Sequence, residues 1–132
     1  MTMSIIPILA AALAAQALPA PGAVRWEEFA VESDGRTAID PASLTREGDF
    51  ARFLVRTENS FTHANGVRLL IMRVLIDCRQ RRMGLEAADA YGANGGFIET
   101  RQVPRAQVAF EPLGTTDAHA ALYRRVCGAP AA

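Results

Sequence analysis

The sequence predicts an α+β fold, in which an antiparallel β-sheet of about six strands carries one C-terminal α-helix on one face, tethered by a disulfide. Three observations predict it. Short segments that alternate between polar and apolar residues are separated by turn signals along most of the chain. The alternation changes to helical spacing only near the C-terminus. Two cysteines, Cys78 and Cys127, follow an N-terminal segment typical of exported proteins.

Residues 1–23 are predicted to be a signal peptide. The segment contains no charged side chain, and Ala15-Gln16-Ala17 fits the small-x-small rule, so we expect cleavage near 17/18, with 23/24 as a second site. An uncleaved anchor is disfavoured because the apolar run is shorter than the roughly 20 residues that span a bilayer. We expect residues 24–132 to form a single domain without a membrane span, exported to the periplasm or cell surface of a Gram-negative bacterium.

Charge is balanced in this chain, with 14 basic and 14 acidic residues, and every basic residue is an arginine. A balanced chain has no global field to attract nucleic acid or an anionic membrane, so neither is expected as a partner. Either the arginine side chains bind anionic groups through their forked guanidinium donors, or their number reflects the amino-acid composition typical of the source genome.

The first half of the domain is predicted to form three strands. Alternation over residues 26–32, followed by the turn dipeptide Asp34-Gly35, predicts a hairpin whose second arm is 36–40. A proline opens Pro41-Ala42-Ser43-Leu44, which predicts a helical turn. A further strand is expected over 49–58, followed by a polar loop that ends at Gly66.

Residues 68–79 give the strongest strand pattern. The even positions form an uninterrupted apolar face that ends in the thiol of Cys78. The odd positions are apolar at one end, which is typical of a central strand that is covered on both sides. We interpret the odd residues as a homodimer or partner face, with a covering loop as the alternative; they are Leu69, Ile71 and Leu75.

The second half of the domain is predicted to form a hairpin and a helix. Strands are expected over 85–91 and 97–103, flanking a glycine-rich turn. From Thr116 to Val126 the apolar residues recur at helical spacing, with capping oxygens before them and Gly128 after them. Cys127 lies beside the apolar stripe of this helix, so a Cys78–Cys127 disulfide would hold the helix on the sheet. Two buried free thiols are the alternative.

Short motifs resemble the surface-adhesin protein E family. They occur in order between Trp26 and Cys127 and are Val24-Arg25-Trp26, Ile39-Asp40-Pro41-Ala42-Ser43-Leu44 with Arg46 and Gly48, Ile76-Asp77-Cys78-Arg79, Tyr91 with Gly95 and Gly96, and Leu122-Tyr123-Arg124-Arg125-Val126-Cys127. The resemblance implies an antiparallel sheet whose C-terminal helix is held by the two cysteines. It also implies dimerisation, adhesion to host extracellular proteins, and haem binding. The chain departs from the family in lacking lysine, and in having Phe53-Leu54 where an exposed tryptophan is common.

No motif predicts catalysis. His63 and His119 lie in unrelated segments without metal-ligand spacing, no serine lies in a nucleophile-elbow context, and no CxxC pair occurs. We therefore expect no catalytic residues, no metal and no cofactor. A small metal-dependent or hydrolytic envelope enzyme is the alternative, and it would need the two histidines to meet in the fold.

Arginines supply the candidate contact surface. Those expected to bind a protein or an anionic glycan are Arg79, Arg81, Arg82, Arg101 and Arg105. A solvated edge that discourages strand pairing is the alternative interpretation. The sequence thus predicts a noncatalytic exported binding protein of the surface-adhesin protein E type, or else a periplasmic envelope protein that never meets a host.

Overall fold

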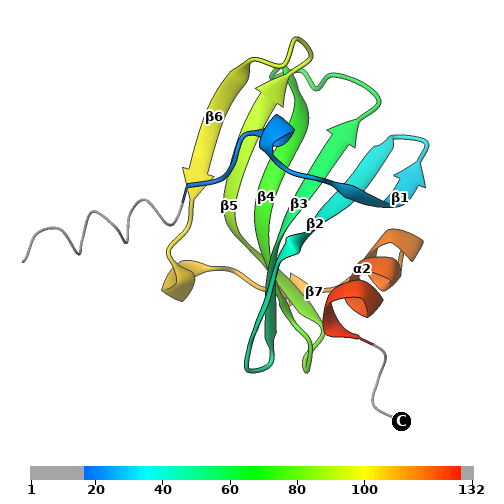
Figure 1. The fold of residues 1–132 in the computed structure, drawn as a ribbon, viewed down its shortest axis with the longest axis vertical. Coiled ribbons are helices and arrows are strands. Elements are labelled where there is room, and N and C mark those ends of the chain that lie inside the picture. Colours follow the sequence, from blue (N-terminus) through cyan, green and yellow to red (C-terminus); the bar gives the residue numbers. More distant parts are fainter. Residues whose placement is uncertain (1–16, 129–132) are drawn as a thin grey trace, which may run out of the picture.

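The computed structural model describes residues 17–128, so the predicted leader up to residue 16 lies outside the described residues. Within them, an antiparallel sheet with strand order β1-β2-β3-β4-β5-β6 carries one α-helix, and β7 pairs with β5 (Figure 1). The elements are η1 (Pro21–Ala23), β1 (Glu27–Glu32), β2 (Gly35–Glu47), β3 (Phe50–Asn59), β4 (Val67–Asp77), β5 (Arg82–Gly92), β6 (Phe97–Gln102), η2 (Arg105–Gln107), β7 (Glu111–Pro112) and α2 (Asp117–Cys127). The predicted α+β fold class is confirmed.

Polar side chains and glycines set where the strands end. The carboxylate of Asp77 accepts the backbone N–H groups of Arg79 at 3.1 Å and Gln80 at 3.0 Å. This turn ends β4 two residues before the predicted boundary. The aspartate side chain accepts hydrogen bonds from the following backbone N–H groups, which therefore do not need to pair with a neighbouring strand. The chain then re-enters the sheet at Arg82, earlier than the predicted Leu85. Gly48, with φ of 62°, lies in the turn between β2 and β3.

The helical turn predicted for Pro41–Leu44 is wrong. These residues belong to β2 and form an enlarged bulge, since the register passes from Asp40 opposite Leu54 to Thr45 opposite Arg52. The Ser43 hydroxyl stabilises the bulge, because it donates to the Asp40 carbonyl at 2.7 Å and accepts the Leu54 N–H at 2.8 Å. Proline is compatible with a strand at such a position because the bulge leaves residues out of the ladder.

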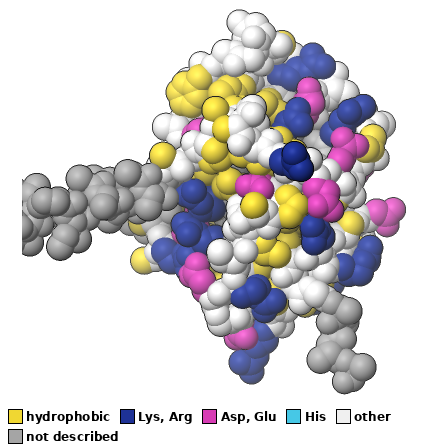
Figure 2. Space-filling view, viewed as in Figure 1, with side chains coloured by type: hydrophobic (Ala, Val, Ile, Leu, Met, Phe, Trp, Pro, Cys, Tyr) yellow, Lys and Arg dark blue, Asp and Glu magenta, His cyan; other side chains and the backbone are white. Residues whose placement is uncertain are grey.

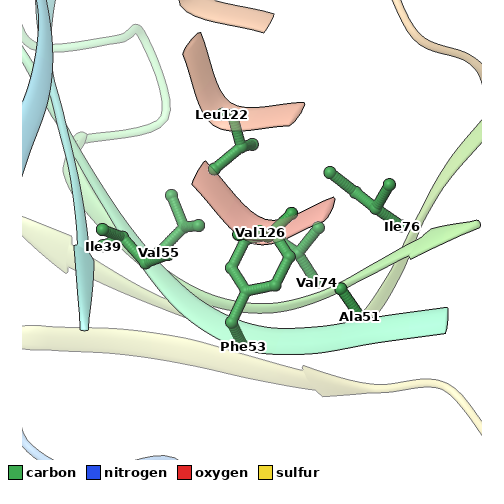
Figure 3. Close-up of a cluster of buried hydrophobic side chains, with 8 residues drawn as sticks. All are labelled: Ile39, Ala51, Phe53, Val55, Val74, Ile76, Leu122 and Val126. Atoms are coloured by element: carbon green, nitrogen blue, oxygen red, sulfur yellow. The ribbon is translucent and has the colours of Figure 1, made fainter. Parts of the chain in front are cut away.

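One face of the sheet packs against α2 and contains the main hydrophobic core. We call it the helix face. The sheet contributes the aromatic ring of Phe53 at the centre, and the helix contributes Leu122 and Val126 (Figure 3). The fully assembled cluster is Ile39, Ala51, Phe53, Val55, Val74, Ile76, Leu122 and Val126. Its β4 members are even-numbered residues, as the parity of that strand predicts.

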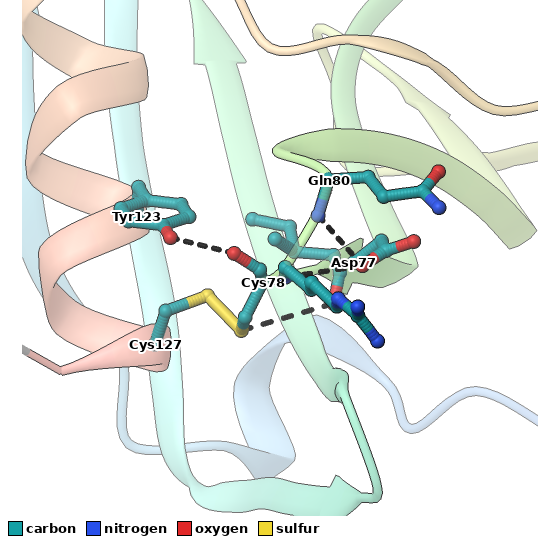
Figure 4. Close-up of a disulfide and its surroundings, with 7 residues drawn as sticks. Asp77, Cys78, Gln80, Tyr123 and Cys127 are labelled. Atoms are coloured by element: carbon teal, nitrogen blue, oxygen red, sulfur yellow. Dashed lines mark hydrogen bonds between the residues drawn. A yellow bond between two sulfur atoms is a disulfide. The ribbon is translucent and has the colours of Figure 1, made fainter. Parts of the chain in front are cut away.

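A disulfide fixes the C-terminal end of the helix to the sheet. Cys78 and Cys127 are bonded, with 5.6 Å between their Cα atoms, and the bridge spans 49 residues (Figure 4). One turn earlier in the helix, the Tyr123 hydroxyl donates a 2.6 Å hydrogen bond to the Cys78 carbonyl. The predicted disulfide and the predicted placement of the helix are both confirmed.

The opposite face of the sheet, which we call the far face, is covered by the chain itself. Ile71 and Leu75 are fully buried, and this corrects their interpretation as a dimer or partner face; Leu69 is half-buried. Gly84 lies opposite Leu75 in the ladder, and a Cβ atom there would collide with the side chain of Val108. The segment after β6 therefore crosses this face, as the covering-loop alternative requires.

Candidate functional site

Three of the predicted contact arginines lie at the turn between β4 and β5, where Arg82 is the first residue of β5. The Arg81 guanidinium stacks 4.0 Å above the centroid of the Tyr123 ring. Arg82 pairs with Asp77 at 3.6 Å and lies 5.5 Å from the Phe110 ring. Two of the three therefore pack the turn against the helix and the chain after η2. Arg79 and Arg81 are exposed, and Arg82 is half-buried.

The other two predicted arginines are separated from that turn. Arg105 donates to Glu86 at 3.1 Å and to Glu47 at 3.3 Å, so two carboxylates already neutralise it. Arg101 lies on β6 opposite Ala88, six residues along β5 from Arg82, which is about 20 Å at strand spacing. Basic and acidic side chains are interspersed over the face that Figure 2 shows. The structure does not gather the five arginines into one forked anion site.

A bulge in β5 places a buried carboxylate on the far face. Ala87 and Leu85 oppose consecutive residues of β4, so Glu86 is the extra residue. Its two oxygens accept hydrogen bonds from Arg52 at 2.6 Å and Arg105 at 3.1 Å. Burial alone would raise the pKa of Glu86, but the two guanidinium groups outweigh burial and lower that pKa below its usual value. The two ion pairs of Glu86 join β3, β5 and the segment around η2.

A cleft lies on the helix face of the sheet, beside the start of α2. Its volume is about 590 Å³, within the range of ordinary ligand pockets. Strands β1 to β5, the chain around β7 and the start of α2 line it. The lining residues are Phe29, Glu32, Thr37, Val55, Thr57, Met72, Val74, Met83, Gly84, Leu85, Ala109, Glu111, Thr116, Ala118, His119 and Leu122.

The cleft exists because the helix is too short to cover the sheet. An 11-residue helix extends about 16 Å, whereas the 11 residues of β4 extend about 36 Å. The bridge fixes the helix near the end of β4, so Val74 and Ile76 join the core while Leu70 stays outside it. The rest of the helix face stays partly open, and Leu85 remains 40% exposed.

The start of α2 is fixed where it borders the cleft. The Thr116 hydroxyl accepts the backbone N–H of His119 at 3.2 Å, which caps the helix. In return, Nδ1 of His119 accepts the Gly114 N–H at 2.9 Å. A Cβ atom at position 114 would lie 2.7 Å from that nitrogen, so a larger residue would force the His119 ring to move. The helix is therefore held at both ends.

The chemistry of the cleft is mainly apolar with an acidic rim. Aliphatic side chains such as Val55, Met72 and Leu85 form its floor, and no arginine lines it although the chain contains 14 basic residues, all arginine. The carboxylates of Glu32 and Glu111 border it, and neither has an ion-pair partner among residues 17–128. Sequence analysis missed this site. The lengths of the helix and of β4 were the signal that could have revealed it.

The two histidines and two of the serines contact neighbouring groups of the described chain. The ring of His63 packs edge-to-face against the ring of Phe61 with centroids 4.8 Å apart, and Nδ1 of His119 accepts the Gly114 N–H. Ser60 donates to a backbone carbonyl at 3.1 Å, and Ser43 stabilises the β2 bulge. In the part of the chain that the structure describes, no three His, Cys, Asp or Glu side chains group as metal ligands would.

None of the described helices is long and apolar enough to cross a bilayer. Comparison with family models, curated proteins and solved structures finds no match to this chain. The resemblance to the surface-adhesin protein E family therefore stays a prediction from the short motifs.

Proposed function

We propose that this chain is a noncatalytic exported binding protein that holds an apolar part of a partner protein in the cleft beside α2. The observation that carries the proposal is an open apolar cleft of about 590 Å³ whose wall is fixed by a disulfide and a capped helix start. A site that is rigid before binding loses little conformational freedom when its ligand arrives. Such a site favours binding.

The occupant that fits best is a small cluster of apolar side chains on the surface of another protein. Apolar groups gain from leaving water in a cleft whose floor is formed by Val55, Met72 and Leu85. Extracellular proteins are the partners that the adhesin-type motifs imply. Display on the cell surface would expose the cleft to them, whereas a periplasmic location would restrict it to envelope proteins.

A charge in the cleft tests the proposal. We expect Leu85→Glu to weaken binding at least tenfold, because an apolar partner group would have to desolvate the new carboxylate. Leu85 is 40% exposed, so the variant should fold. Val31→Glu is the matched control. Val31 is 64% exposed and lies on the far face of the sheet, opposite Arg36 in the ladder between β1 and β2. The measurement is biolayer interferometry against immobilised extracellular-matrix proteins and purified envelope proteins.

Equal binding by wild type and Leu85→Glu would exclude the cleft as the contact site. In the same assay, an Arg79→Glu and Arg81→Glu double variant tests the arginine turn. Loss of binding in that variant alone would move the site from the cleft to the turn.

Location is tested separately by adding protease to whole cells. Loss of the intact protein supports surface display and an adhesin role. Survival supports the alternative of a periplasmic envelope protein without host contact.

A further inference from the structure

Three oxygen-bearing side chains line the β1 side of the cleft. They are the Glu32 carboxylate on β1 and the hydroxyls of Thr37 on β2 and Thr57 on β3. Thr37 lies directly opposite Thr57 in the ladder, which places their Cβ atoms about 5 Å apart. Glu32 lies opposite Gly35, so Thr37 is its diagonal neighbour, within reach of a long side chain. The register therefore gathers one carboxylate and two hydroxyls at one side of the cleft.

The carboxylate of Glu32 has no ion-pair partner within residues 17–128. Arg68 borders a neighbouring hollow that Glu32 also lines. However, Nε of Arg68 donates to the Asn59 carbonyl at 3.1 Å, and Arg68 does not line the cleft. The negative charge of Glu32 is thus not neutralised by a side chain of the described residues.

Aliphatic side chains connect this group of oxygens with the floor of the cleft. Val55 is two residues from Thr57 on β3, so the two side chains share a face. Met72 lies opposite Val55 in the ladder, and both line the cleft. A long side chain with a charged head can pack its methylenes on such apolar groups while the head stays in a polar environment. The cleft offers both environments side by side.

We propose that the β1 side of the cleft binds the ammonium group of a lysine side chain from the partner protein. An ammonium group has three N–H donors, and Glu32, Thr37 and Thr57 supply three separate acceptor groups. The four-carbon stem of the lysine packs over Val55 and Met72. This inference rests on the proposed function, because it adds a charged contact to the binding of apolar groups in the same cleft.

Lysine fits this site better than arginine does. A guanidinium group is a planar fork that matches two oxygens of one carboxylate, whereas the acceptors here come from three different strands. The sequence of this chain contains no lysine. A second copy of the chain therefore cannot supply the side chain, and the lysine must belong to a different protein.

Peptide binding tests the ammonium site directly. The probe is a fluorescein-labelled peptide with a central run of leucine and phenylalanine and a lysine at one end. The matched probe has acetyl-lysine at that position, which keeps the methylenes but removes the charge. In fluorescence anisotropy titrations, we expect the wild-type protein to bind the lysine peptide about fivefold to tenfold more tightly than the acetylated peptide.

Variants of the acceptor groups should remove this preference. Glu32→Gln keeps the size of the side chain and loses its charge, so it should bind both peptides about equally. Glu28→Gln is the matched control and should keep the preference, because Glu28 lies on the same strand but does not line the cleft. Both glutamates are exposed, so circular dichroism should show that these variants fold. A Thr37→Val and Thr57→Val double variant keeps the shape of both side chains and should reduce the preference.

Three results would overturn the inference. They are equal binding of the two peptides by wild type, a lysine preference that survives Glu32→Gln, and failure of the lysine peptide to bind at millimolar concentration. Leu85→Glu separates these results from failure of the proposed function. If wild type binds both peptides equally and Leu85→Glu weakens both, the apolar cleft remains a binding site and the ammonium site is excluded.

Discussion

The two faces of the sheet are stabilised by different physical means. On the helix face, an apolar cluster centred on Phe53 packs against a helix that the Cys78–Cys127 bridge holds in place. On the far face, the buried carboxylate of Glu86 joins Arg52 and Arg105, and the chain around η2 is held by this ion-pair network. Covalent and hydrophobic stabilisation fixes one face, and charge pairing fixes the other.

The difference explains why the open cleft lies on the helix face. On the far face, the segment after β6 lies directly on Gly84, and Leu75, which is opposite Gly84 in the ladder, is fully buried. On the helix face, α2 covers only the part of the sheet near the bridge, so an open cleft remains beside the helix. Localised stabilisation is what allows exposed apolar surface to persist in a stable fold.

Removing the bridge should have the largest effect. In the chain-entropy view, a bridge that spans 49 residues stabilises the folded state by about 4 kcal/mol. We expect the Cys78→Ser and Cys127→Ser double variant to lose about that much free energy of unfolding in urea titrations. Wild type treated with a reductant is the control and should match it. A loss below about 1 kcal/mol would mean that the core of the helix face holds the helix without covalent help.

Neutralising Glu86 should have an intermediate effect and act through the far face. Glu86→Gln removes the charge that two guanidinium groups bond, and should cost about 1–3 kcal/mol near pH 7. Glu47→Gln is the control, because Glu47 is 46% exposed and its pair with Arg105 contributes less than about 1 kcal/mol.

The effect of Glu86 should depend on pH with a defined sign. Its folded-state pKa is lowered below the unfolded value, which is about 4.3 for glutamate. Its contribution is therefore complete above that value and is lost as pH falls through the folded-state pKa. Free energies of unfolding measured from pH 7 to pH 3 should converge for wild type and Glu86→Gln on the acid side. A constant difference would contradict the charge network.

The smallest expected effect is at the start of α2. Thr116→Ala removes the side-chain oxygen that caps the helix and should cost about 1 kcal/mol in thermal or urea unfolding. Thr115→Ala, one residue outside the cap, should change stability by less than about 0.5 kcal/mol. If both variants behave alike, the bridge alone positions the wall of the cleft.

Local patterns sufficed for much of the fold. Alternation located the principal strands, and the change to helical spacing located α2 to within one residue at each end. Even-numbered apolar residues of β4 placed Cys78 on the face that receives the helix. These features are determined by periodicity within a short segment, because a strand or helix must turn its apolar residues to one side.

The sequence by itself therefore determined the sheet, the helix and the covalent link between them. Only the tertiary structure determined four other features. They are the bulge at Pro41–Leu44, the burial of Ile71 and Leu75, the extra residue Glu86 in β5, and the size of the cleft. Each of these depends on which residues distant in sequence come together. Register shifts and covering segments are set by pairing across strands, and no single segment contains that information.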